Sequence, residues 1–458
     1  MLEREAYKTI EQWHRLKTRQ GLLVTGARQV GKTTLIRRFG ADNYRHIAEI
    51  NFIETPQAVQ TVSQATDTND LLLRLSVLSG TQITPGQTLL FLDEIQACED
   101  MLTWLKFLSG AKGLDVIVSG SLLGIDVFNV RSIPVGFLQT MRMYPLDFKE
   151  FCVACGVPES ALSAVHESIA ANRAVPGFLH DRLMDLWYKY LLVGGMPDAV
   201  QAFIDTSDIN AVRNVQCSIF ETYEYDITKH VDTPVERRHI KTIYEMIPSQ
   251  LNAENKRFKF SKLGQNVRFA HMQTAFDWLA NAGIALPTPR VQDPEYPLDA
   301  HDDLNAFKLY LNDVGLLTSR LMRSVDLEII NHKSSMNFGS IFENAAAQEL
   351  FSRGFALHYY NRSRIGEVDF VIEHGLDSIS LVEIKSGKDY RRHNAMNNLL
   401  ATDNYGFRHA YVFHDGNVEI VPIEDSARRG TGNGAGNGAS VIEYLPIYAL
   451  AWLEPTKD

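Results

Sequence analysis

Residues 21–39, GLLVTGARQVGKTTLIRRF, join a short aliphatic run, a glycine-rich loop and the start of a helical pattern. The loop matches the pattern GxxxxGK(S/T), with Gly26, Gly31, Lys32 and Thr33 at its fixed positions. Glycines let the backbone turn tightly enough for its N–H groups to surround phosphates, and the lysine reaches the terminal phosphates. The stretch therefore predicts a strand, a phosphate-binding loop and a helix.

The predicted nucleotide-binding residues are the whole loop and the first helical residues: Gly26, Ala27, Arg28, Gln29, Val30, Gly31, Lys32, Thr33 and Thr34. The Thr33 hydroxyl is also expected to ligate Mg²⁺. The alternative is a glycine-rich turn before an ordinary helix, and the aliphatic run directly before the loop argues against it.

Three further aliphatic runs follow, at residues 46–52, 88–93 and 115–119, with helical patterns between them. This alternation is typical of buried parallel strands in an open α/β sheet. We therefore expect the first part of the chain to fold as a parallel sheet covered by helices.

Two acids end the run TLLFLDE, and they are candidates for catalysis. We expect Asp93 to hold Mg²⁺ through water and Glu94 to activate the attacking water as a general base. Ser119 or Ser121, which follow the residues DVIV of the run at 115–119, is the candidate that senses the terminal phosphate. Together with the loop, these residues predict nucleotide hydrolysis.

The composition of the 458 residues, 45% hydrophobic and 22% charged, is typical of a soluble protein with several domains. No run of about 18 uncharged apolar residues occurs, so we expect no membrane span. A charged amphipathic start and only four cysteines favour a cytoplasmic location. The net charge of −10 argues against a protein coated in nucleic acid, but a local basic patch would still bind phosphates.

Pattern changes along the chain predict four domains. They are a P-loop ATPase domain at 1–155, a helical lid or connector at 156–235 with a turn at Gly194 and Gly195, a winged helix at 236–325, and an α/β domain at 326–458. A low-complexity stretch at 426–440 is expected to be a flexible loop.

The stretch at 257–291, RFKFSKLGQNVRFAHMQTAFDWLANAGIALPTPRV, resembles a winged helix-turn-helix. Its second helix is expected at 271–282, ending at Gly283. Five basic residues lie nearby without an acid between them: Lys256, Arg257, Lys259, Lys262 and Arg268. They predict phosphate contacts with DNA, although the second helix carries no Arg or Lys, and such modules also serve as structural or protein-binding units.

The stretch at 366–387, GEVDFVIEHGLDSISLVEIKSG, carries acids and a lysine on two apolar runs. If the runs pair as a hairpin, Asp369 and Glu383 can share a divalent ion, and Lys385 lies on the same strand face as Glu383. Glu343 lies near the start of an amphipathic helix upstream. Two amphipathic strands that happen to carry charges are the alternative.

Two resemblances connect these motifs to known families. The stretches GARQVGKTTL, FLDEIQ, VSGSLL, MYPLDFKEF and LVGGMPDAV resemble bacterial and archaeal AAA-type ATPases with a C-terminal DUF4143 region, expected over about 195–400. This resemblance implies ATP as the nucleotide and a homo-oligomer or a switch. It does not assign an arginine finger, for which Arg131 and Arg142 are the candidates.

The second resemblance is to the PD-(D/E)xK nuclease core, although Val368 stands where that motif has proline. It implies that Asp369 and Glu383 bind Mg²⁺, and that Glu343 and Lys385 complete the catalytic set. The predicted fold is thus a multidomain α/β protein: a P-loop sheet, a helical lid, a winged helix and a nuclease-like domain. The function follows in two versions, an ATPase coupled to a nuclease acting on DNA, or an ATP-driven switch that binds DNA or a protein without cutting.

Overall fold

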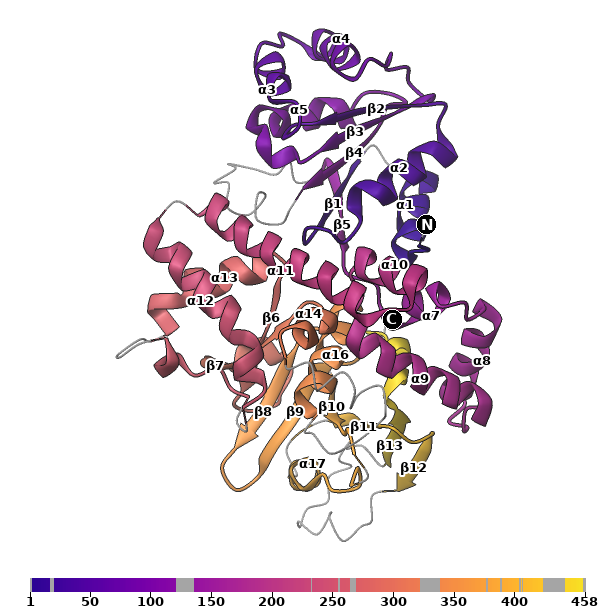
Figure 1. Cartoon of the computed structure of the whole chain (residues 1–458), viewed down its shortest axis with the longest axis vertical. Coiled ribbons are helices and arrows are strands. Elements are labelled where there is room, and N and C mark those ends of the chain that lie inside the picture. The colour runs from indigo at the N-terminus through magenta and orange to yellow at the C-terminus, as the bar shows by residue number, and fades with distance from the viewer. Residues whose placement is uncertain are drawn as a thin grey trace. The chain divides into compact units, whose positions relative to one another are not determined.

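A computed structural model describes residues 2–16, 20–120, 136–231, 233–253, 256–263, 269–321, 338–375, 378–387, 389–402, 405, 407–422 and 441–455. The chain divides into two compact units (Figure 1). The first comprises residues 1–144, with 281–283 assigned to it, and the second comprises 145–280 and 284–458. Ser121, Arg131, Arg268 and the stretch 426–440 lie outside the described residues.

The first unit contains a five-stranded parallel sheet with the order β2-β3-β4-β1-β5. Its strands are β1 (Gly21–Gly26), β2 (His46–Asn51), β3 (Thr88–Asp93), β4 (Asp115–Gly120) and β5 (Leu138–Met143). The four aliphatic runs in the sequence are thereby confirmed as strands. The fifth strand, LQTMRM, was not predicted, because polar residues interrupt its apolar positions.

Helices cover both faces of this sheet (Figure 1). They are α1 (Glu5–Leu16), α2 (Lys32–Asn43), α3 (Pro56–Ser63), α4 (Thr68–Ser79) and α5 (Glu99–Ser109). Side chains of α3, α4 and α5 form one apolar cluster with alternate strand residues such as Leu90 and Leu92. The other face carries α2, where a Cβ added to Gly40 would lie 3.1 Å from the Leu89 side chain.

The second unit contains an eight-stranded mixed sheet with the order β12-β13-β11-β10-β9-β8-β6-β7. The strands are β6 (Ala285–Val291), β7 (Asp302–Leu311), β8 (His358–Arg362), β9 (Gly366–Glu373), β10 (Ile379–Ile384), β11 (Phe407–His414), β12 (Glu419–Pro422) and β13 (Val441–Pro446). Strands β6 and β7 lie inside the range expected for a winged helix, and β6 pairs with β8 in this one sheet. The boundary expected at residue 325 therefore falls within a compact unit.

The helices of the second unit are α7 (Phe148–Ala154), α8 (Glu159–Ala170), α9 (Gly177–Val193), α10 (Pro197–Thr206), α11 (Ile209–His230), α12 (Pro234–Leu251), α13 (Phe269–Asn281), α14 (Val314–Ser319), α16 (Gly339–Ser352) and α17 (Asn394–Leu400). Helix α13 lies where the second helix of the basic module was expected. Its apolar residues Phe276 and Leu279 are buried. None of the described helices is both long and apolar enough to cross a membrane.

Two sequence motifs, MYPLDFKEF and LVGGMPDAV, are linked by hydrogen bonds to Asp313, the residue that precedes α14 in the second unit. Its carboxylate accepts hydrogen bonds from the backbone N–H of Gly195, at 2.6 Å, and of Leu316, at 2.9 Å. The Gly195 carbonyl accepts in turn from the Leu146 N–H at 2.7 Å. The turn predicted between α9 and α10 is confirmed, and its second glycine has no space for a side chain, since an added Cβ would lie 2.0 Å from the Leu146 oxygen.

Candidate functional site

The phosphate-binding loop joins β1 to α2 with left-handed backbone at two positions. The φ angles are 62° at Gln29 and 92° at Gly31, the residue that precedes the helix. Gly26 lies against β5, and an added Cβ would be 2.2 Å from the Met143 carbonyl oxygen. The glycines of the motif are thus required by the tight turn and by close packing against a neighbouring strand.

Lys32 and Thr33 are the first two residues of α2, and their side chains contact different partners. The buried Lys32 Nζ donates to the carbonyl oxygens of Gly26, at 3.0 Å, and Ala27, at 2.8 Å. The Thr33 hydroxyl donates to Asp93 Oδ2 at 3.0 Å. The structure therefore brings the loop next to the acidic end of β3, because the carboxyl ends of parallel strands meet at one edge of a sheet.

The buried Asp93 carboxylate accepts hydrogen bonds from residues of α2, β4 and β2. In addition to Thr33, Ser119 on β4 donates to Oδ1, and the Asn51 amide at the end of β2 donates to Oδ2 at 3.2 Å. Asn51 was not among the predicted residues. Its place at the carboxyl end of a strand next to β3 is the signal that would have identified it.

Glu94, the expected general base, has left-handed backbone with φ of 54° and accepts a hydrogen bond from the Gln96 amide. Such a conformation is uncommon for a residue other than glycine and often occurs at functional positions. The donor set of Thr33 and Asp93 suits Mg²⁺, which prefers hydroxyl, carboxylate and water oxygens. Arg142, one arginine-finger candidate, lies on β5 with its guanidinium 5.6 Å from the Tyr144 ring centre.

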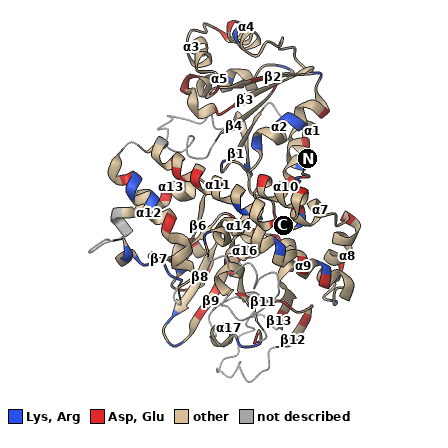
Figure 2. Ribbon diagram, in the orientation of Figure 1, with Lys and Arg blue, Asp and Glu red and all other residues tan. Residues whose placement is uncertain are grey.

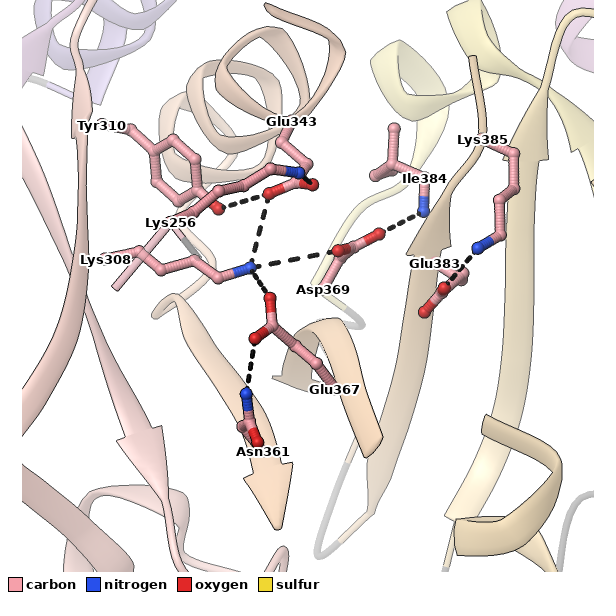
Figure 3. A network of polar contacts seen from close by, with 10 residues as sticks. All are labelled: Lys256, Lys308, Tyr310, Glu343, Asn361, Glu367, Asp369, Glu383, Ile384 and Lys385. Atoms are coloured by element: carbon pink, nitrogen blue, oxygen red, sulfur yellow. Dashed lines mark hydrogen bonds and ion pairs between the residues drawn. The ribbon is translucent and has the colours of Figure 1, made fainter. Parts of the chain in front are cut away.

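The second candidate site is a buried group of acids and lysines in the other unit, which we call the acid–lysine cluster (Figure 3). It consists of Lys256, Lys308, Tyr310, Glu343, Glu367, Asp369, Glu383 and Lys385. Glu343 on α16 is 3% exposed and pairs with Lys256 through one oxygen. Its other oxygen accepts from Lys308 at 3.4 Å and from the Tyr310 hydroxyl at 3.1 Å.

A β-bulge in β9 determines where Asp369 points. Tyr360 on β8 pairs with Val368, but His358 pairs with Val371, so β9 has one extra residue between these pairs. Val368 and Val371 both pack in the apolar cluster that includes α17. Asp369 between them approaches Lys308, and its Oδ2 accepts from the Ile384 N–H at 2.9 Å. Bulges often re-aim a side chain beside an active site, and strict alternation cannot predict this one.

Glu383 and Lys385 complete the cluster at the end of β10. Strands β9 and β10 pair antiparallel, as predicted, up to Phe370 and Val382, and Asp369 and Glu383 are the next residues along each strand. Lys385 Nζ donates to Glu383 Oε1 at 2.6 Å, so both side chains lie on the same side, as expected. The other Glu383 oxygen, Oε2, is buried and has no hydrogen-bond partner.

The pKa values of the acids in the cluster are shifted in different directions. Burial opposes ionisation of Glu343, but Lys308 and Lys256 outweigh burial and lower the pKa of Glu343 to about 2. Burial and the carboxylates of Glu343 and Glu383 raise the pKa of Asp369 well above its usual range. Burial also raises the pKa of Glu383, although Lys385 opposes this shift. Lys256 and Lys308 therefore neutralise Glu343, whereas burial and the neighbouring carboxylates outweigh the contacts of Asp369 with Lys308 and of Glu383 with Lys385.

These observations test whether a metal ion fits the cluster. Asp369 and Glu383 fit one Mg²⁺, because a buried carboxylate oxygen without a partner is a ready ligand for a cation. Glu343 does not fit as a direct ligand, because both its oxygens are already taken by lysines and a tyrosine. Among the described residues, the group of three metal-type donors within 4.8 Å of one another is instead Asp299, Asp302 and His358.

Two lysines of the acid–lysine cluster were not predicted from the sequence as site residues. Lys256 was expected on a basic surface; this is corrected by its ion pair with the buried Glu343. Lys308 lies in the strand AFKLYL with its side chain fully buried. A lysine in the middle of an apolar strand was the available signal, because lysines are almost never fully buried unless paired.

Family models match three parts of the chain. Residues 18–152 match the AAA domain, residues 184–326 match a domain of unknown function, DUF8612, and residues 338–427 match a domain of unknown function, DUF4143. The chain thus carries an AAA-type P-loop domain followed by a C-terminal DUF4143 region, and this resemblance is confirmed. The DUF4143 match begins at residue 338, not near 195 as expected, because DUF8612 matches most of the preceding residues. The acid–lysine cluster joins the last two parts, since Lys308 comes from the DUF8612 match and Asp369 from the DUF4143 match.

Solved structures give weaker likenesses. The Orc1 protein of Aeropyrum pernix, in complex with DNA, has 12% identity and a TM-score of 0.27 over 73% of this chain and 93% of its own. Cdc6p from Pyrobaculum aerophilum has 12% identity and a TM-score of 0.24 over 72% and 93%. The Pif1 helicase from Candida albicans has 12% identity and a TM-score of 0.23 over 40% and 47%. At these TM-scores we infer nothing from them, and no curated protein matches the chain.

Proposed function

We propose that the first unit binds MgATP and hydrolyses it. The main support is the hydrogen bond from Thr33 to Asp93, which joins the phosphate-binding loop to the acidic end of β3. Mg²⁺ held by Thr33 and, through water, by Asp93 would neutralise charge on the phosphates. Lys32 would exchange its two carbonyl partners for terminal phosphate oxygens. Glu94 would take a proton from the water whose oxygen bonds to the terminal phosphorus as ADP leaves.

We further propose that the acid–lysine cluster cleaves phosphodiester bonds of nucleic acid. The specific support is the unpartnered oxygen of Glu383 and the raised pKa of Asp369, to which burial and the carboxylates of Glu343 and Glu383 contribute. Mg²⁺ at these two residues would offset the charge that builds on the scissile phosphate. Lys385, the more accessible lysine with 25% of its side chain exposed, would position the phosphate or the attacking water.

DNA is the nucleic acid we favour, bound through its phosphates. The support is a short segment in which Arg257, Lys259 and Lys262 are exposed beside α13. Figure 2 shows basic and acidic residues together on the neighbouring α12, so phosphate contacts would come from this short segment rather than from a broad basic face. The homo-oligomer expected from the family resemblance stays a prediction.

One comparison separates cleavage from the switch alternative. The purified chain is incubated with Mg²⁺ and supercoiled, linear or branched DNA, with and without ATP. Cleavage that is lost in both Asp369→Asn and Lys385→Ala supports the nuclease. ATP turnover without cutting of any substrate, with DNA binding intact, supports the switch. Loss of turnover in Lys32→Ala tests the ATPase separately.

A further inference from the structure

We infer that Lys308 is a built-in cation of the acid–lysine cluster, so that the cluster takes a single divalent ion at Asp369 and Glu383 and excludes a second ion beside Glu343. The inference rests on the proposed metal-dependent cleavage. In this inference Lys308 positions the neighbouring carboxylates and determines how many metal ions bind. This role differs from that of the four residues predicted to catalyse the reaction.

The position of the ammonium group carries the first step. Lys308 Nζ lies 2.7 Å from Glu367 Oε1, 3.4 Å from Glu343 Oε2 and 3.9 Å from Asp369 Oδ1 (Figure 3). In two-metal centres the ions lie about 3.5–4 Å apart and share a carboxylate between them. An ion bound by Glu343 and Asp369 would have to stand where this ammonium stands.

The burial of Lys308 carries the second step. Its side chain has no exposed surface, and Nζ lies 5.0 Å from the centre of the Tyr359 ring. Lys256 and Lys385 differ, with 18% and 25% of their side chains exposed. A lysine held inside the strand layer cannot swing into water to make room for a metal ion, whereas the two outer lysines can.

The charge of the cluster carries the third step. Four carboxylates, from Glu343, Glu367, Asp369 and Glu383, face three lysines. Their formal net charge is −1, so one divalent cation brings the cluster to +1 and a second would bring it to +3. Because excess charge inside a protein is unfavourable, the cluster accommodates one ion far better than two.

The test is the number of Mn²⁺ ions bound by the full chain without nucleotide, measured by titration with electron paramagnetic resonance. The wild-type chain is expected to bind one ion that disappears in Asp369→Asn. Lys308→Met keeps the length of the buried side chain and removes its charge; it is expected to bind two neighbouring ions, with a spectrum broadened by their coupling. Lys8→Met, which changes an exposed lysine of α1, is the matched control and should keep one ion.

The outcomes separate this inference from the proposed cleavage. Two ions in the wild-type chain, both lost in Asp369→Asn, overturn the role of Lys308 and leave cleavage standing. No ion sensitive to Asp369→Asn overturns both. An ion retained in Asp369→Asn and lost in His358→Ala belongs to the group Asp299, Asp302 and His358. It is therefore subtracted from the number of ions bound by the acid–lysine cluster. If Lys308→Met does not fold, the wild-type ion count decides between one and two ions, and Lys308→Gln replaces the variant.

Discussion

Lys308 Nζ and Asp369 Oδ1 lie 3.9 Å apart, although strands β8 and β6 separate β9 from β7 in the sheet. Lys308 Nζ and the Tyr310 hydroxyl, both from β7, also donate to the same oxygen of Glu343. Although burial opposes its charged form, the carboxylates of Glu343, Glu367 and Asp369 outweigh burial and raise the pKa of Lys308 above its usual value. The acid–lysine cluster is therefore held together by a charge from outside the nuclease-like motif.

Lys32→Ala and Asp93→Asn are expected to lower ATP turnover by about 100-fold or more, because each removes a charged contact to the phosphates or their Mg²⁺. Steady-state phosphate release measures the effect. Lys8→Ala changes an exposed lysine of α1 and is the matched control. Turnover at the wild-type rate in Lys32→Ala would refute the assignment of the loop.

Asp369→Asn and Lys385→Ala are expected to abolish Mg²⁺-dependent DNA cleavage while ATP turnover stays at the wild-type level. The reason is that both residues lie in the second unit, whereas the residues proposed to bind ATP belong to the first. Gel analysis of plasmid DNA at several Mg²⁺ concentrations measures cleavage. Equal cleavage by the wild-type chain and Asp369→Asn would mean that a contaminant or another site cuts the DNA.

Glu349 on α16 is expected to make stability depend on pH. Burial and the nearby Asp147 raise the pKa of Glu349 from 4.5 to about 8, and the group accepts hydrogen bonds from the Phe148 N–H and the Tyr190 hydroxyl. Because the folded state holds this proton more tightly than the unfolded state, its stabilising effect is full below pH 4.5 and is lost as the pH rises towards 8. Within that window the loss is roughly 1.4 kcal/mol per pH unit.

The measurement is urea unfolding of the wild-type chain and of Glu349→Gln, which cannot ionise. The free energy of unfolding of the wild type should fall more steeply between pH 5 and pH 8 than that of the variant. Parallel curves for the two proteins would show that Glu349 does not titrate in this range.

Gly195→Ala is expected to destabilise the second unit by roughly 3 kcal/mol or more, because the new Cβ meets the Leu146 backbone, which cannot move without breaking its own hydrogen bond. Gly177→Ala is the matched control, since nothing lies within 4 Å of an added Cβ there. Thermal unfolding followed by circular dichroism compares the two variants. A melting temperature for Gly195→Ala equal to that of Gly177→Ala would contradict the packing described here.

The double variant Lys259→Glu/Lys262→Glu is expected to weaken DNA binding and to reduce the salt dependence of the affinity by about one unit of slope for each lost phosphate contact. Fluorescence anisotropy at several salt concentrations measures both quantities. The double variant Lys8→Glu/Lys112→Glu, at two exposed lysines, changes the net charge by the same amount and is the control. An unchanged slope would mean that Lys259 and Lys262 contact solvent and not DNA phosphates.

Much of the first unit could be predicted because its signals are local. The aliphatic runs gave four of five strands, and the loop pattern located Lys32 and Thr33 at the start of a helix. Asn51 was missed because its role depends on which strand lies next to β3. The order of strands is set by how helices pack over the sheet, and no short stretch of sequence states it.

In the second unit, the sequence predicted local elements but not how they are joined. Its helix and strands around Glu343, Asp369 and Glu383 were predicted, but the expected boundary between a winged helix and a nuclease-like domain falls inside one sheet. Lys308 could not be placed from the motif, because its strand precedes the motif in the chain and joins it only through the pairing of β6 with β8.

The phosphate-binding loop and the identity of the acids could be predicted without a structure, because glycine spacing and strand-end carboxylates depend on neighbours along the chain. How the lysines are distributed among the acids follows from the fold. An extra residue in β9 turns Asp369 towards Lys308, and a buried lysine from a distant strand neutralises Glu343 but leaves Glu383 with an unpartnered oxygen. Charge balance in a buried site is a sum over all side chains that meet there, so it exists only once the chain has folded.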